Sequence, residues 1–390
     1  MNAPFYKDRH FLAPAFRIEL DGQDAGREVY SDVLEVSFTD DLKNIDSFEF
    51  NLNDWDHEAQ RPKYSSPWDE NGNPYKLSEN GKDVPNFEPG TKVSLYMGYV
   101  ENGELPLIME GEVISISPSF PASGSPTCRV RALDSFLRNL QKTRVENNYS
   151  GTAKSIVDQL CSENDIPVDW ATLDSEGLPE DNVAVEGILY DEIASRAEEY
   201  GLSIFTKTNA GSPSLSLKAP FAGGDTPVVE FEWGRTLISF SPVLSVKGQV
   251  SAVIARGGDP ESESDGQNLE ARKTWSDIGL SPTALGPAGK TDIENAVPGL
   301  VEVIKPDKIT KAEEAEDAAL AHLRKLAAEL ITASGTSVGL PEIRAGETIK
   351  ISKMGTRFDG LYRVIQTTHS IGGSGYTTSF KVRKEVLENG

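Results

Sequence analysis

Basic charge, cysteine and histidine are scarce in this sequence. Its 390 residues include 38 lysines and arginines against 61 aspartates and glutamates, giving a formal net charge of -23. Proteins that bind nucleic acids or anionic membranes present clusters of basic side chains. The charge balance therefore disfavours both partners, and we expect no nucleic-acid binding.

Metal-ligand patterns are also missing. The two cysteines, Cys128 and Cys161, and the four histidines show no metal-type spacing. A structural zinc site needs four ligands at short spacings, and a disulfide scaffold needs more cysteines. We therefore predict no metal site, no cofactor and no disulfide framework.

Long apolar runs are absent as well. No stretch approaches the roughly 18 apolar residues of a membrane-spanning helix. Residues 1–10 lack the apolar core of a secretory signal. We expect a chain that is made in the cytoplasm and does not span a membrane.

Short strands dominate the first 150 residues. Apolar and polar residues alternate in several short runs, and Asp21-Gly22 supplies a hairpin turn after the first. This pattern is typical of a β-barrel or sandwich. Residues 54–90 interrupt it and predict an irregular insertion. The alternating runs are 16–20, 33–38, 47–52, 92–99, 107–116 and 127–132.

The middle of the chain changes character. Thr152 is suited to cap a helix through about residue 162, and Gly201 is suited to end a second helix at 190–200. Strand patterns follow at 202–206 and 215–217. These elements predict a small α+β domain at 151–227.

Strand patterns return from residue 228. An irregular stretch at 257–299 precedes a helix that starts at a capping box of Thr310 and Glu313 and ends before Gly335. We predict a second β domain at 228–390, with an irregular and helical insertion at 257–335. The first β domain is predicted at 1–150.

Three motifs resemble functional sites, and none fits its chemistry. Residues 284–291 resemble a phosphate-binding loop, but Ala284 replaces its first glycine and Pro287 removes a backbone donor. Residues 69–73 resemble a calcium loop whose glycine comes too early and whose position twelve is Asn80. The third motif is Gly335-Thr336-Ser337-Val338-Gly339, followed by Asp359 and His369 in the order of a hydrolase triad. It lies between a helix and a strand, so a helix end and loop is the better interpretation. We predict no catalytic, cofactor-binding or metal-binding residues, and no enzyme.

The last 80 residues carry a recognisable pattern. It consists of an alanine-rich helix at 312–333, then segments 339–349, 358–365, 368–370 and 375–380. Together with segments 109–114, 131–134 and 188–205, this resembles the phage late control protein D family. That family comprises tail hubs of contractile phages and related injection systems, and it is related to the hub part of type VI secretion spike proteins.

The resemblance implies a fold and a role. It implies a mainly β protein in which two tube-like β-barrel domains bracket a small α+β domain. It further implies a structural hub that forms a homotrimeric ring and joins a six-fold inner tube to a three-fold spike in the baseplate. The partners would be an inner tube or tube-initiator protein, a separate spike protein and other baseplate proteins. His369 is expected to hold a structural hydrogen bond near a strand end.

Two alternatives stay open. A phage-associated glycan-binding or hydrolytic tail protein would use the insertion at 54–90, where Trp55, Trp68 and Tyr75 would line a groove for sugar. An adhesin or fibre-attachment protein would be elongated or peripheral on the particle.

Overall fold

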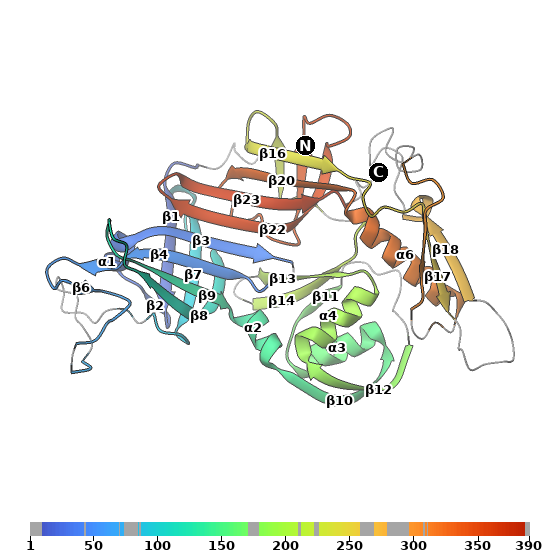
Figure 1. Ribbon diagram of the computed structural model, residues 1–390, viewed down its shortest axis with the longest axis horizontal. Helices are drawn as coiled ribbons and strands as arrows, with labels where there is room; N and C mark the ends of the chain where they lie inside the picture. Colours follow the sequence, from blue (N-terminus) through green and yellow to red (C-terminus); the bar gives the residue numbers. More distant parts are fainter. Residues whose placement is uncertain are drawn as a thin grey trace. The chain divides into compact units, whose positions relative to one another are not determined.

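The computed structural model describes residues 10–42, 44–69, 71–73, 85, 87–170, 179–209, 212–221, 226–257, 269–278, 296–306, 309 and 311–386 (Figure 1). The chain forms two compact units. The first runs to Asn139 and also contains residues 336–342 and 367–379. The second contains residues 140–335, 343–366 and those from Phe380 onward.

Six strands of the N-terminal part make up what we call the first strand set. They pair in the order β3-β4-β9-β8-β7-β1, and all five pairings are antiparallel. The predicted turn is present between β1 and the two-residue strand β2 (Gln23–Asp24). Asp21 and Gly22 both have positive φ, of 49° and 77°, which a two-residue type I′ turn requires. The set comprises β1 (Pro14–Leu20), β3 (Val33–Asp41), β4 (Ser47–Asn53), β7 (Lys92–Tyr99), β8 (Leu107–Ser119) and β9 (Thr127–Asp134).

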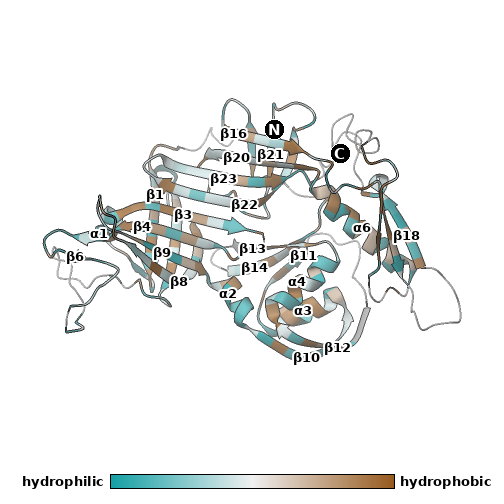
Figure 2. Ribbon diagram, in the orientation of Figure 1, coloured by the Kyte–Doolittle hydropathy of each residue, from teal (hydrophilic) through white to brown (hydrophobic). Residues whose placement is uncertain are grey.

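The core of the first unit follows from the alternation along these strands. Phe38, Phe48 and Phe50 are all buried, and the Phe48 and Phe50 rings stack with centroids 5.4 Å apart. Hydrophobic and hydrophilic segments alternate along β3 and β4 (Figure 2). Burying each phenylalanine contributes about 1.5–3 kcal/mol. The face of the sheet that carries these phenylalanines is therefore the one buried in the core.

Short elements complete the first unit. α1 (Arg27–Asp32) lies between β2 and β3 in the chain, and η2 (Val100–Asn102) follows β7. β5 (Trp55–Asp56) and β6 (Arg61–Pro62) form a small hairpin within the predicted insertion.

The next part of the chain contains helices and strands, as the sequence predicts. The Thr152 hydroxyl accepts a hydrogen bond from the Ser155 N–H (3.2 Å) and caps α3. Ile156, Val157 and Leu160 form the buried face of this helix. The elements are α2 (Ser135–Lys142), β10 (Arg144–Thr152), α3 (Ala153–Glu163), β11 (Val168–Trp170), β12 (Pro179–Ile188), α4 (Leu189–Glu199), β13 (Ser203–Asn209) and β14 (Ser212–Lys218).

A second strand set follows. It pairs in the order β16-β20-β23-β22-β21-β15. An inserted group of elements between β16 and β20 consists of β17 (Ala252–Gly257), β18 (Leu269–Thr274), η3 (Trp275–Ile278), β19 (Val301–Ile304) and α6 (Ala312–Ala328). The set itself comprises β15 (Val229–Glu232), β16 (Leu237–Leu244), β20 (Ile331–Val338), β21 (Thr348–Ser352), β22 (Gly360–Gly372) and β23 (Gly375–Arg383).

The two strand sets have the same topology. Numbered from one to six along the chain, the strands of each set pair in the order 2-3-6-5-4-1. The first strand of each set differs in direction, because β1 is antiparallel to β7 whereas β15 is parallel to β21. The chain therefore contains one strand arrangement twice, within a mainly β fold with α+β insertions, as predicted.

The last helix is shorter than predicted. α6 ends at Ala328, and Gly335 lies inside β20, where its Cα faces the Phe380 ring. The Lys311 N–H donates to the Glu314 carboxylate (3.0 Å), so Glu314, not Glu313, is the capping acid. Thr310 lies outside the described residues. Among the helices that the structure describes, none is both long and apolar enough for a membrane span.

Candidate assembly site

The residues of the nucleophile-elbow motif do not form a catalytic site. Ser337 is buried in β20 and its hydroxyl donates to the Val338 carbonyl (2.9 Å). The Asp359 carboxylate accepts from the Met354 N–H (2.6 Å). An activated serine needs an exposed hydroxyl next to a base, and this arrangement lacks both features.

His369 belongs to a buried polar cluster. Its Nδ1 atom lies 3.0 Å from the Tyr376 hydroxyl and 3.0 Å from the Thr378 hydroxyl. The Leu340 N–H donates to the same Thr378 hydroxyl (3.0 Å), and Phe38 stacks on the imidazole. His369 thus has the structural hydrogen bond expected of it.

The remaining motifs offer no ligand site in the described part of the chain. Residues 284–291 and Asn80 lie outside it. The Asp69 carboxylate is occupied by amides of Asn71 and Asn73, and these hydrogen bonds lower its pKa. No group of three or more histidine, cysteine or acidic side chains could hold a metal among the residues described.

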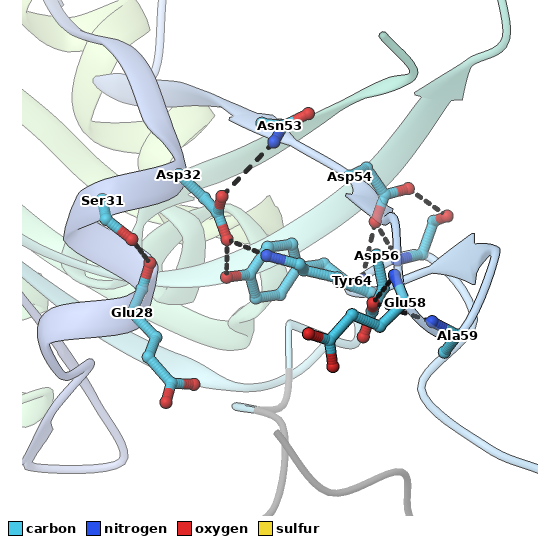
Figure 3. A network of polar contacts seen from close by, with 11 residues as sticks. Glu28, Ser31, Asp32, Asn53, Asp54, Asp56, Glu58, Ala59 and Tyr64 are labelled. Atoms are coloured by element: carbon cyan, nitrogen blue, oxygen red, sulfur yellow. Dashed lines mark hydrogen bonds and ion pairs between the residues drawn. The ribbon is translucent and has the colours of Figure 1, made fainter. Parts of the chain in front are cut away.

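A network of carboxylates holds the start of the 54–90 insertion (Figure 3). The buried Asp54 carboxylate accepts from the N–H groups of Tyr64 (2.6 Å) and Ser65 (3.2 Å). Asp32 accepts from the Tyr64 hydroxyl (2.7 Å) and from Lys63 Nζ (2.9 Å). Burial and the neighbouring Asp32 raise the pKa of Tyr64, so its hydroxyl stays a donor. The Asp32 and Asp54 carboxylates both accept hydrogen bonds from groups of the chain itself. We therefore interpret the network as one that stabilises the fold.

The structure describes two of the three aromatic residues of the glycan hypothesis. Trp55 is half-buried, Trp68 is 43% exposed, and Tyr75 lies outside the described residues. Arg61 Nη2 binds the Trp68 carbonyl (2.7 Å) and thereby fixes the backbone there.

Two strand edges are the most distinctive open features of the fold. β16 lies at one end of the strand order, so one of its edges has no neighbouring strand among the described elements. β8 pairs with β7 only up to Glu112 and, in the described structure, continues to Ser119 with no strand on that side. Unpaired N–H and C=O groups at such edges are ready to pair with another chain.

Sequence reasoning missed these edges, although a signal was available. The segment Ile114-Ser115-Ile116-Ser117-Pro118 in β8 matches Ile238-Ser239-Phe240-Ser241-Pro242 in β16 at four of five positions. Neither segment contains a charged residue, whereas charged side chains make up 25% of the protein. Natural edge strands usually carry charges that block pairing. Comparing strand segments with one another would have singled out both.

One family model matches most of this chain. A family model described as the Alg8 N-terminal domain matches residues 16–373, which is most of the chain. The chain belongs to the Alg8 N-terminal domain family. No curated protein matches this sequence.

Solved structures show the fold. A 43 kDa tail protein of prophage MuSo2 from Shewanella oneidensis is 15% identical, with a TM-score of 0.63, covering 96% of this chain and 99% of the other. A tail protein from Neisseria meningitidis is 11% identical, with a TM-score of 0.60, covering 96% and 100%. A component of the E. coli type VI secretion system is 12% identical, with a TM-score of 0.50, covering 94% and 76%. The chain therefore has the fold of phage tail proteins.

Proposed function

We propose that this chain is a structural, non-enzymatic hub protein of a contractile tail or injection-system baseplate. Three copies form a ring that joins a six-fold inner tube to a three-fold spike. This is the role that the resemblance to the late control protein D family implies. The protein is made in the cytoplasm and then becomes part of the baseplate.

The observation that carries this proposal is the repeated strand order. A chain with two strand sets of one topology presents six similar sets when three copies surround an axis. Closed cyclic symmetry is the usual arrangement of homo-oligomers. A ring of this kind matches a six-fold partner on one side and a three-fold partner on the other.

The proposed partners are those that the family resemblance implies. They are an inner tube or tube-initiator protein, a separate spike protein and neighbouring baseplate proteins. Within the chain we propose a first tube-like domain at 1–150, a small α+β domain at 151–227 and a second tube-like domain at 228–390. We further propose that the insertions at 54–90 and 257–335 contact the other baseplate proteins.

Light scattering on the purified chain, combined with class-averaged electron images, tests the proposal. We expect the mass of three chains and rings with six lobes. A monomer that forms no ring, even with tube and spike proteins present, would reject it. Cleavage or binding of glycans by the purified protein would instead support the alternative of a glycan-directed tail protein.

A further inference from the structure

The inserted group of elements between β16 and β20 contains a small sheet with a helix on one face. β17 pairs antiparallel with β18 and parallel with β19, and α6 packs against β17 and β18 (Figure 1). Lys273 Nζ of β18 binds Glu316 of α6 (2.6 Å). His322 of α6 lies 3.1 Å from Glu302 of β19. Because Lys273 and Glu302 are both cross-strand partners of Val253, this row of side chains faces the helix.

The adjacent rows face away from the helix. Successive side chains of a strand point to opposite faces of the sheet. Arg272, Ile254 and Val303 are the next cross-strand partners, and they form the central row of the other face. Val303 is 44% exposed, whereas Val253 under the helix is fully buried. We call this second face the outer face, and it consists of Ile254, Val301, Val303, Arg256, Glu270 and Arg272.

The outer face is unusually apolar for a surface in contact with water. A sheet that packs a helix on one side normally presents polar residues on the other. Here Ile254 and Val301 are only half-buried and Val303 is exposed, so three aliphatic side chains lie together on one exposed side of the sheet. Adjacent exposed apolar side chains with polar neighbours are typical of a protein interaction site.

The charges of the outer face are opposite in sign to those of the chain. Arg256 Nε pairs with Glu270 (2.8 Å). Arg272 is exposed and forms no ion pair with a residue that the structure describes. Two arginines and one glutamate leave this face with a positive charge, whereas the whole chain has a net charge of -23. The face therefore favours a partner that supplies a carboxylate.

Two other kinds of partner fit less well. Nucleic acids are held by many cations along their phosphates, and the outer face has two arginines, one of which is already paired. A second copy of the same face, related by a two-fold axis, would bring identical charges toward each other, which costs affinity. An acidic polypeptide with apolar side chains avoids both problems.

We propose that the outer face binds an acidic amphipathic helix of another baseplate protein. Its apolar side chains cover Ile254 and Val303, and one of its carboxylates pairs with Arg272. β17 and β18 have six residues each, which span about 20 Å, and a helix of about 13 residues has the same length. The helix would cover this face as α6 covers the opposite one. This inference rests on the proposed function and deepens it by assigning one contact of the insertion.

Photocrosslinking in purified tail particles tests the position and the chemistry of the partner. With p-benzoylphenylalanine in place of Val303, irradiation should link the chain to another protein, at an acidic segment whose apolar residues have helical spacing. The same substitution at Val100, an exposed apolar residue of the first unit, should give different products. Links from position 303 to nucleic acid, to a second copy of this chain or to a basic segment would overturn the inference, as would the absence of links.

A peptide of defined sequence tests the charge argument on the isolated full chain. The probe is a labelled helical peptide of about 14 residues with leucines at helical spacing and glutamates elsewhere. Its counterpart has lysines in place of the glutamates. Fluorescence anisotropy should show binding of the glutamate peptide at least about tenfold tighter than that of the lysine peptide. Equal binding of the two peptides would overturn the inference.

Variants of exposed residues show whether the glutamate peptide occupies the outer face. Arg272→Glu and Val303→Asp should each weaken its binding about tenfold or more, because the first repels its carboxylates and the second also removes apolar contact. Val100→Asp adds the same charge to an exposed position of the first unit and should leave binding unchanged. Equal effects of Val303→Asp and Val100→Asp would place the peptide elsewhere and overturn the inference.

Failure of this inference can be distinguished from failure of the proposed function. Trimeric rings of this chain in tail particles, without links from position 303, would overturn the inference and leave the hub proposal standing. A chain that binds the glutamate peptide through Arg272, but is monomeric and absent from tail particles, would support the outer face as a binding site and count against the hub.

Discussion

The two strand sets share a strand order but differ in what they bury near their ends. The core of the first unit is built from aromatic and aliphatic side chains, with Phe38 and Phe48 fully inaccessible. In the second unit, Arg363 of β22 is 0% exposed, and Glu385, just after β23, is 2% exposed. The Arg363 Nε lies 3.4 Å from Glu385 Oε1. The second unit thus buries this ion pair, whereas the first unit buries Asp54 and His369 among hydrogen-bonding neutral groups.

The insertions differ in a parallel way. The insertion after β4 is held by the Asp32 and Asp54 carboxylates, whereas the insertion after β16 packs with its own helix. Ala315, Ala319 and Leu323 of α6 are fully buried. Connections tolerate such additions because they leave strand pairing unchanged. The comparison shows that pairing order defines the repeat and that side-chain chemistry is free to vary around it.

Loss of the buried ion pair should have the largest effect on stability. Arg363→Met leaves Glu385 buried with Arg383 as a cationic neighbour (3.7 Å), and we expect a loss of about 3–5 kcal/mol in unfolding free energy. Urea unfolding measures it. Arg256→Met is the control, since its exposed ion pair with Glu270 contributes about 1 kcal/mol at most. Equal losses would show that the buried pair does not stabilise the second unit.

Glu385→Gln sharpens this test. Burial raises the pKa of Glu385, although Arg363 and Arg383 pull it down. A raised pKa in the folded state means that stability falls as the pH rises through that pKa. Glu385→Gln should therefore cost less than Arg363→Met and should reduce the pH dependence of stability. A larger loss for Glu385→Gln would contradict this account.

Two phenylalanines, each on the second strand of its set, should differ in their cost of removal. Phe38→Ala should destabilise the protein by about 4–5 kcal/mol, since Phe38 is fully enclosed. Phe240→Ala, in β16, should cost about 3 kcal/mol, because this side chain is 8% exposed and loses less burial. Urea unfolding measures both. Equal losses would show that the two side chains are equally enclosed.

Much of the fold was predictable because strands of period two and their turns are local signals. The Asp21-Gly22 turn and the Thr152 cap are examples, since neighbouring residues determine both. The end of α6 was mispredicted because residues 329–333 continue the apolar pattern while tertiary pairing with the sheet draws Ile331 and Ala333 into β20.

The candidate assembly site was less accessible from sequence. To recognise it, one must know that β8 extends beyond its pairing with β7 and that β16 lies at the end of the strand order. Both features depend on pairing between residues that are far apart in the sequence. The serine-proline segments at 114–118 and 238–242 were visible, but their meaning depends on this topology. The network around Asp54 was equally hard to predict from the sequence, because Asp32 and Tyr64 are 32 positions apart.

Removing one hydroxyl should loosen the first insertion moderately. Tyr64→Phe deletes the hydrogen bond to the Asp32 carboxylate, which retains Lys63, so we expect a loss of about 1.5 kcal/mol. Tyr362→Phe is the control in the second unit, where the acceptor is the neutral Phe358 carbonyl (2.6 Å) and about 1 kcal/mol is expected. Unfolding by urea and the rate of proteolysis near residues 54–66 measure both. Faster proteolysis there in Tyr362→Phe than in Tyr64→Phe would refute the structural role of the network.

The smallest expected effect on stability is that of the two cysteine thiols. One thiol lies in each unit, so each can be used to follow the opening of its own unit. Cys128 lies in β9 of the first unit and Cys161 in α3 of the second, and burial raises the pKa of each to about 12. Both thiols should therefore stay neutral and resist iodoacetamide at pH 8. A raised pKa in the folded state means that this contribution to stability is lost as the pH rises from about 9 toward 12.

Variants with a single thiol allow the opening rates of the two units to be compared. Cys161→Ala leaves Cys128 as the reporter of the first unit, and Cys128→Ala leaves Cys161 for the second. With urea below the unfolding midpoint, the rate of alkylation measures how often each unit opens. Because β20, β22 and β23 contribute residues to both units, we expect the two thiols to become reactive together. Labelling of one thiol at much lower urea than the other would show that the shared strands do not couple the units.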